Sequence, residues 1–142
     1  MTISSAARSK ARRFILQALY QIQLTGDPAA AVVKQFVEDH DMKRVDTVYF
    51  DEVLPAVMRE ENALWSLIDP LLDRSREELD PVERAILLLG TYELTHRIDV
   101  PFRVVIDEAI ELARMFGASE SYKYVNSILD QLSKTQRIAE QR

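Results

Sequence analysis

Apolar residues recur at helical spacing from the start of the chain. Residues 2–24 contain neither proline nor glycine, and their apolar positions repeat every three or four residues, which places them on one stripe of a helix. Gly26 and Pro28 end the pattern. The stripe consists of Ala11, Phe14, Ile15, Ala18, Leu19 and Ile22. The pattern therefore predicts an amphipathic helix over residues 2–24.

Further stripes predict helices in the middle of the chain. Two of them cover residues 29–39 and 45–54. Pro55 removes a backbone donor, so we expect it to kink or divide the segment around it. A third stripe covers residues 64–72 and is interrupted near its end by Pro70.

A strong helix start follows at residue 80. Asp80 is a capping residue, Pro81 suits the first helical position, and Glu83 is placed to complete a capping box. Residues 85–89 are all apolar, so this helix is predicted to be apolar nearly all round and therefore central.

Two amphipathic helices complete the chain. The first covers residues 105–116 and is predicted to close at Gly117. Ser119 is predicted to cap the second, whose inner face is Val125, Ile128, Leu129 and Leu132. No alternation typical of strands occurs, so the sequence predicts a single all-α domain over residues 1–142 with about six or seven helices. We expect residues 1–7 and 135–142 to fray.

Composition excludes several classes of function. The 142 residues suit one domain, and the absence of cysteine excludes disulfides, zinc–thiolate sites and a thiol nucleophile. The three glycines are far apart, which excludes a phosphate-binding glycine loop, and only His40 and His96 are available for histidine chemistry. No apolar run exceeds five residues, too few for a membrane span. These observations predict a protein that is not an enzyme and needs no cofactor or metal.

Charge is distributed unevenly along the chain. Residues 1–26 contain four basic residues and no acidic one, whereas the rest has 14 basic and 23 acidic residues, a charge of −9. A basic end on an acidic protein indicates a local site for a polyanion. The four basic residues are Arg8, Lys10, Arg12 and Arg13.

The first predicted helix carries the best candidate site on the side opposite its apolar stripe. Cations neutralise phosphates, amides read base edges and an aromatic ring stacks on bases, a combination suited to single-stranded nucleic acid. Arg8 and Arg12 lie at the margin of the stripe and would extend the cationic strip. A solvated basic helix and an organellar transit peptide are the alternatives. The residues of this face are Lys10, Arg13, Gln17, Tyr20 and Gln21.

The last predicted helix offers a weaker second patch. Lys123, Tyr124 and the amides at the helix start could meet an RNA strand, although a capped helix whose tyrosines only cover the core is the favoured explanation of the pattern. Asp107, Glu108 and Glu111 lack the companions that a metal site needs. The acidic residues at 77–83 suit either a solvated loop or a docking edge for a basic partner.

Several motifs, spread in order over nearly the whole chain, resemble those of the NusB family of bacterial transcription antitermination factors. They are Ala-Arg-Arg at 11–13, Gln-Ala-Leu-Tyr at 17–20, Asp-Pro-Val-Glu-Arg-Ala-Ile-Leu at 80–87, Tyr-Glu-Leu at 92–94, Val-Pro at 100–101, Ile-Asp-Glu-Ala-Ile-Glu-Leu-Ala at 106–113, Phe-Gly at 116–117 and Lys-Tyr-Val-Asn at 123–126. The resemblance implies an all-helical fold of two small packed bundles. It also implies a cytoplasmic bacterial protein that binds boxA RNA together with NusE, a small-subunit ribosomal protein. That pair would recruit other Nus factors to RNA polymerase and suppress premature termination in ribosomal RNA operons.

Site residues follow from the same resemblance. The RNA-binding positions fall on the basic face of the first helix and on a second group in the last helix, and the NusE side falls near the start of the central helix. RNA-binding residues are Arg8, Lys10, Arg12, Arg13, Gln17, Tyr20, Glu120, Lys123 and Tyr124, and NusE-binding residues are Glu77, Glu83 and Arg84.

Three positions depart from the family pattern, namely Ser9 within the basic run, Pro55, and Ser127 where glycine is common. A related domain begins a ribosomal RNA cytosine methyltransferase, but this chain has no cysteine and no residues for a methyl-donor domain. A helical protein-interaction adaptor without an RNA site remains the alternative.

Overall fold

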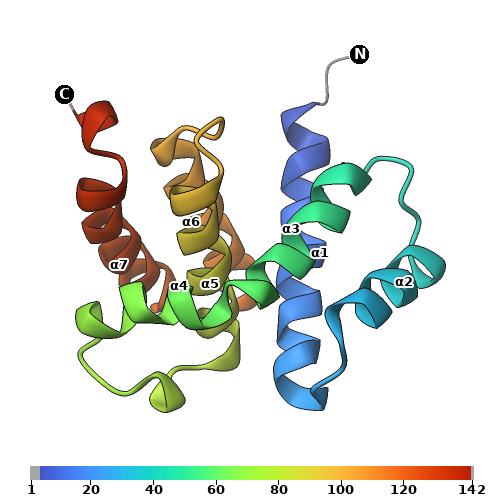
Figure 1. Cartoon of the computed structure of the whole chain (residues 1–142), viewed down its shortest axis with the longest axis horizontal. Coiled ribbons are helices and arrows are strands. Elements are labelled where there is room, and N and C mark those ends of the chain that lie inside the picture. Colours follow the sequence, from blue (N-terminus) through green and yellow to red (C-terminus); the bar gives the residue numbers. More distant parts are fainter. Residues whose placement is uncertain (1–3, 142) are drawn as a thin grey trace. The chain divides into compact units, whose positions relative to one another are not determined.

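The computed structural model describes residues 4–141. They form seven α-helices and three short 3-10 helices, and no strand occurs within this range (Figure 1). The all-α prediction is therefore confirmed. The chain divides into two compact units, Met1–Arg59 and Glu60–Arg142.

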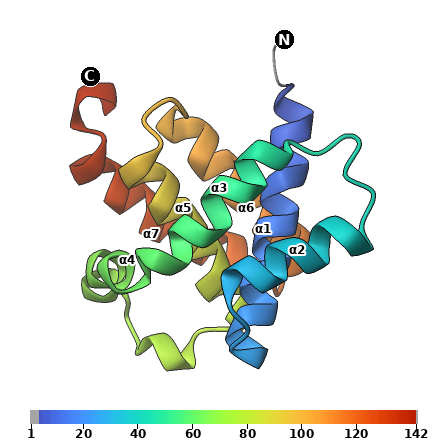
Figure 2. The ribbon, with the colours of Figure 1, turned by 45° about the vertical axis from the view of Figure 1, so that its right-hand side comes forward.

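The first unit contains α1 (Ser5–Thr25), α2 (Ala29–Asp39) and α3 (Thr47–Arg59), and each of these helices contacts the other two. Figure 2 shows the three helices in a second view. The apolar stripe predicted for the first helix faces this core, where Ala11, Ile15, Ala18 and Leu19 are at most 1% exposed.

Local signals define the ends of α1. The Ser4 hydroxyl accepts a hydrogen bond from the Ala7 amide at 3.0 Å, which satisfies one of the free donors at the helix start. Gly26 ends the helix with φ 74°, a left-handed conformation that costs glycine nothing. Residues 5–7, which were expected to fray, are thus helical, and residues 1–3 lie outside the described range.

Pro55 does not divide the third helix. Helix α3 runs without a break from Thr47 to Arg59 with Pro55 inside it, so the expected division is wrong. Proline removes only one helical hydrogen bond, and its neighbours are firmly held, since Leu54 and Val57 are 0% exposed. Core packing therefore outweighs the local preference of proline.

The second unit is built around α5 (Pro81–His96), which contacts helices of its own unit on several sides. Its residues 85–94 are all buried, which confirms the central helix predicted from the apolar run. The other elements of this unit are α4 (Glu61–Ile68), η1 (Asp69–Leu71), η2 (Arg76–Glu78), α6 (Phe102–Phe116), α7 (Ser121–Gln136) and η3 (Ile138–Gln141).

The predicted start of α5 is confirmed in detail. Asp80 Oδ1 accepts from the Val82 amide at 2.7 Å, and the Asp80 amide donates to Glu83 Oε1 at 3.3 Å. These reciprocal bonds form a capping box, with Pro81 at the first helical position. The predicted cap of α7 is wrong, because Glu120 rather than Ser119 precedes that helix and no side chain caps it.

The close approach of α5 and α7 depends on glycine. A Cβ atom at Gly90 would lie 2.8 Å from Leu129 Cδ1, nearer than atoms of this kind normally approach. The absence of a side chain at Gly90 therefore lets the buried Leu129 pack directly against the backbone of the central helix.

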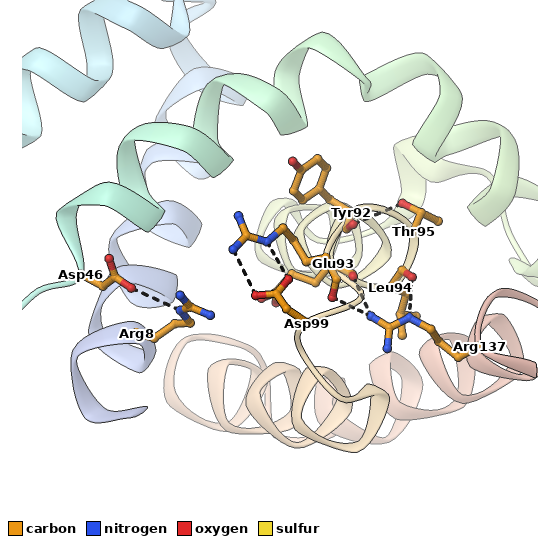
Figure 3. A network of polar contacts seen from close by, with 9 residues as sticks. Arg8, Asp46, Tyr92, Glu93, Leu94, Thr95, Asp99 and Arg137 are labelled. Atoms are coloured by element: carbon orange, nitrogen blue, oxygen red, sulfur yellow. Dashed lines mark hydrogen bonds and ion pairs between the residues drawn. The ribbon is translucent and has the colours of Figure 1, made fainter. Parts of the chain in front are cut away.

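A buried arginine fixes the other end of α5. The guanidinium of Arg137 donates from Nε to the Leu94 carbonyl at 2.8 Å, and from Nη2 to the Glu93 and Arg97 carbonyls at 3.0 and 2.8 Å (Figure 3). Its Nη1 pairs with the Glu140 carboxylate. Arg137 gives the Leu94 carbonyl a donor near the end of α5, and it adds a second donor to the Glu93 and Arg97 carbonyls, which also accept from backbone amides. Helix α7 continues to Gln136 and η3 covers Ile138–Gln141, so part of the segment that was expected to fray is helical.

Candidate nucleic-acid interface

A groove of about 260 Å³ lies beside the basic face of α1. Lys10, Arg13 and Gln17 line it from α1, three and four residues apart as the helical period requires. The loop between α2 and α3 contributes further lining residues. The remaining lining residues are Phe14, Asp41, Arg44 and Val45.

Three cations in this groove have no carboxylate partner. Within residues 4–141, the side chains of Lys10, Arg13 and Arg44 form no ion pair. Asp41, the one carboxylate in the lining, accepts a hydrogen bond from the Lys43 amide at 3.0 Å. The groove therefore offers positive charge to an incoming anion.

Arg8 is tied into the first unit instead of being free on the helix surface. Its Nε lies 3.2 Å from Asp46 Oδ2 (Figure 3). Its guanidinium carbon lies 4.3 Å from the centre of the Tyr49 ring. The other oxygen of Asp46 accepts from the Tyr49 amide at 3.1 Å and so caps α3. Arg8 thus links α1 to the start of α3 while keeping part of its side chain exposed.

Arg12 does not extend the cationic strip as the sequence suggested. It is 2% exposed, and its guanidinium carbon lies 5.6 Å from the centre of the Tyr49 ring. A cation that is removed from solvent cannot make direct contact with a phosphate. Arg12 lies at the margin of the apolar stripe, and this margin is close enough to the core to bury its side chain. The side chain of Arg13, the next residue, is exposed.

The other predicted residues of α1 lie at the surface. Tyr20 is 39% exposed, and Gln17 is partly exposed with its amide donating to the Arg13 carbonyl at 3.2 Å. Gln21 donates to Gln35 of α2 at 2.9 Å. Helix α1 therefore presents two cations, an amide and an aromatic ring to solvent.

The second unit holds the candidate residues of α7. The Tyr124 hydroxyl donates to Asp73 Oδ1 at 3.0 Å, and the guanidinium carbon of Arg74 lies 4.8 Å from the centre of the Tyr124 ring. Arg74 also forms two hydrogen bonds with Asp73, at 2.8 and 3.2 Å. The ring is thus fixed in place by residues of the loop before η2.

Titration of this cluster follows from these contacts. The hydrogen bond from Arg74, helped by the one from Tyr124, holds the pKa of Asp73 below its ordinary value. Partial burial and the hydrogen bond to Asp73 raise the pKa of the Tyr124 hydroxyl. Asp73 is therefore ionised and Tyr124 protonated at neutral pH, which keeps the bond between them charge-assisted.

Lys123 and Glu120 form an exposed pair, with Nζ and Oε2 2.8 Å apart. An exposed pair of this kind contributes little to stability and can open when a stronger anion approaches Lys123. Glu120 itself carries the wrong charge for phosphate, so any contact that it makes with RNA must involve base or sugar groups.

The residues predicted for the protein partner lie around the start of α5. Glu77 is exposed in η2. Glu83 belongs to the capping box, and Arg84 donates from Nε to the Leu79 carbonyl at 3.2 Å. Glu83 and Arg84 therefore support the local fold as well as offering charge at the surface.

Two residues near these sites were missed by the sequence reasoning. Arg44 lies just before the helix that was predicted to begin at Val45, and Arg74 follows the apolar stripe predicted over residues 64–72. Both lie close to predicted residues through the fold and not through sequence spacing. The only available signal was their charge in loops that contain few apolar residues.

The described residues offer neither a metal-binding cluster nor a helix suited to a membrane. Over residues 4–141, no group of three or more histidine and acidic side chains is arranged to hold a metal ion. In the same range, no helix combines the length and apolar character that crossing a membrane requires.

Comparisons with known proteins identify the family to which the chain belongs. A family model described as the NusB family matches residues 9–134. The transcription antitermination protein NusB of Marinobacter nauticus is 50% identical over 135 residues, covering 95% of this chain and 85% of the relative.

Solved structures agree with the sequence comparisons. NusB of T. maritima matches with a TM-score of 0.80 and 32% identity, over 89% of this chain and 90% of the other. A crystal structure of the antitermination factors NusB and NusE in complex with double-stranded RNA matches with a TM-score of 0.85 and 26% identity, over 93% and 99% of the two chains.

Proposed function

Because the chain belongs to the NusB family, we propose that it is a transcription antitermination protein that binds the boxA element of nascent ribosomal RNA together with NusE. It acts by binding and not by catalysis. The complex brings other Nus factors to RNA polymerase and suppresses premature termination. This work takes place in the bacterial cytoplasm.

The groove beside α1 is the observation that carries the proposal. Lys10 and Arg13 offer unpaired positive charge, and Gln17 lies between them and the exposed ring of Tyr20. RNA needs cations for its phosphates and flat surfaces for its bases, and this helix presents both on one side. Arg8 contributes through the part of its side chain that is exposed beside Asp46.

Helix α7 supplies a second contact region in the proposed function. Lys123 can exchange Glu120 for a phosphate, and the Tyr124 ring is held in a fixed orientation by Asp73 and Arg74. A ring fixed in this way loses little conformational freedom when a base stacks on it.

NusE is proposed to dock around η2 and the start of α5. Glu77, Glu83 and Arg84 supply charges of both signs within eight residues, a pattern that favours a specific orientation of the partner over general attraction. An RNA-binding partner that docks here would offset the net charge of −5, which opposes RNA binding by the chain alone.

Fluorescence anisotropy tests the proposal directly. A labelled boxA RNA, a scrambled RNA and a boxA duplex are each titrated with the full chain, with and without NusE. We expect selective binding of boxA that strengthens with NusE. A contact with about three to five phosphates of single-stranded RNA would give a log–log salt slope of about −2 to −3.5.

Variants of the exposed face connect the binding to these residues. The double substitution Arg13→Ala and Tyr20→Ala should weaken boxA binding without changing the circular dichroism spectrum. Lys34→Ala is the matched control, since Lys34 is an exposed cation of the same unit outside the groove. If the unmodified chain, the double variant and Lys34→Ala all bind boxA with equal affinity, α1 is not part of the RNA site.

A helical adaptor without an RNA site gives a different result in the same titrations. Binding to boxA and to scrambled RNA would then be equally weak, with no gain on adding NusE. In that case the family membership would describe the fold of the chain but not its RNA binding.

A further inference from the structure

We infer that the groove between α1 and the loop at residues 40–46 is a phosphate-binding site for the RNA strand, and that Arg44 contributes to it from the loop. This inference deepens the proposed function and rests on it. It adds a residue of the loop between α2 and α3 to an interface that the sequence placed only on helices α1 and α7.

The geometry of the groove favours an anion that reaches inside it. Lys10 and Arg13 line the groove from α1 and Arg44 lines it from the loop, so an anion in the groove would meet cations from two elements of the fold. Of these three side chains, none is engaged by a carboxylate in the part of the chain that the structure describes. A phosphate would therefore not have to break an existing ion pair before binding.

The apolar part of the lining suits a sugar or base edge attached to that phosphate. Phe14 and Val45 are half-buried and contribute apolar surface to the same groove. Its volume of about 260 Å³ has room for a phosphate group together with its sugar. A free inorganic anion would use the cations but would leave this apolar surface uncovered.

Asp41 adjusts the affinity of the site. Its carboxylate holds the turn of the loop by accepting from the Lys43 amide, but its negative charge also faces the groove. An asparagine would keep an oxygen for that amide while removing the charge. Asp41→Asn should therefore bind RNA about two- to threefold more tightly, because one unfavourable charge near the phosphate is lost.

The decisive experiment compares Arg44→Ala with Lys43→Ala. Both variants lose one cation from the same loop, but Lys43 does not line the groove. We expect Arg44→Ala to weaken boxA binding by about three- to tenfold, and to reduce the size of the log–log salt slope by about 0.7. Lys43→Ala should leave the slope unchanged. Thermal unfolding of each variant checks that the fold is intact.

The outcomes separate this inference from the proposed function. If Arg13→Ala weakens binding but Arg44→Ala behaves like Lys43→Ala, RNA binds α1 and the groove is not part of the site. If Asp41→Asn weakens binding, the carboxylate does not oppose a phosphate there and the inference fails. If the unmodified chain with NusE shows no salt-dependent binding of boxA, the proposed function itself fails. Inorganic phosphate that competes with RNA only through ionic strength would agree with a site that also needs the sugar.

Discussion

The hydroxyl group of Tyr124 donates a hydrogen bond to Oδ1 of Asp73 at 3.0 Å, and so joins residues that are 51 positions apart. The bond fixes an aromatic ring of α7 against the loop that precedes η2. The guanidinium of Arg74 lies over one face of the ring and pairs with the same carboxylate. A candidate stacking surface is thus positioned by side chains far away in the sequence.

The pKa of Tyr124 tests this arrangement. Asp73→Ala removes the acceptor that favours the protonated phenol, so the pKa of Tyr124 should fall towards its ordinary value. Partial burial is the larger cause and remains, so the pKa should stay above that value. Ultraviolet titration of tyrosinate measures the change, and Tyr124→Phe identifies the transition. Identical titration curves for Asp73→Ala and the unmodified chain would contradict the hydrogen bond.

Arg137 is predicted to be the most important charged residue for stability. Arg137→Ala should lower the free energy of unfolding by about 2–4 kcal/mol, because it removes the donor of the buried Leu94 carbonyl and one of the donors to the Glu93 and Arg97 carbonyls. Arg137→Lys should recover only part of the loss, since an ammonium cannot reach all of these carbonyls at once. Urea unfolding measures the effect. Lys134→Ala, at an exposed position in the last turn of α7, is the control and should change stability by less than about 0.5 kcal/mol.

Glu140 makes part of the stability depend on pH. The Phe102 amide and Arg137 both favour its ionised form, which places its pKa below the ordinary 4.5. The stabilisation is therefore complete at pH values above 4.5 and is lost as the pH falls through the lowered pKa. The difference in stability between the unmodified chain and Glu140→Gln should be constant at neutral pH and shrink below 4.5. A difference that stays constant down to pH 2 would show that Glu140 makes no ionised contact.

The stability of the protein should depend on which residue replaces Asp46. Asp46→Ala loses both the cap of α3 and the pairing with Arg8, which should cost about 2–3 kcal/mol because the site is buried. Asp46→Asn keeps an oxygen for the Tyr49 amide and should cost about half as much. Thermal unfolding followed by circular dichroism distinguishes the two. Equal losses would mean that the charge and not the cap holds the start of α3.

The helices could be predicted because their signals are local. Asp80, Pro81 and Glu83 lie next to one another in sequence, and the capping box follows from their spacing alone. The bounds of the helix at 29–39 likewise came from a short apolar pattern between two breaks. In both cases the residues that favour the helix over other conformations lie within a few helical turns of one another.

The errors occur where the tertiary structure decides. Pro55 was judged by its missing donor, but the buried side chains beside it keep α3 continuous. Arg12 was placed at the edge of a stripe, and only the packed structure shows that this edge is buried. The groove with Arg44 was not visible in the sequence, because its two walls are brought together by the fold of the first unit.

The hydrogen bond between Asp46 and Ala7 determines which partner has to become ordered when RNA binds the groove. The backbone amide of Asp46 donates to the Ala7 carbonyl at 3.0 Å. The loop at residues 40–46, which lines part of the groove, is therefore anchored to α1 through its last residue, Asp46. A loop held at this point has already lost much of its conformational entropy when the protein folds. The groove is therefore shaped before any ligand arrives, and only the RNA has to become ordered on binding.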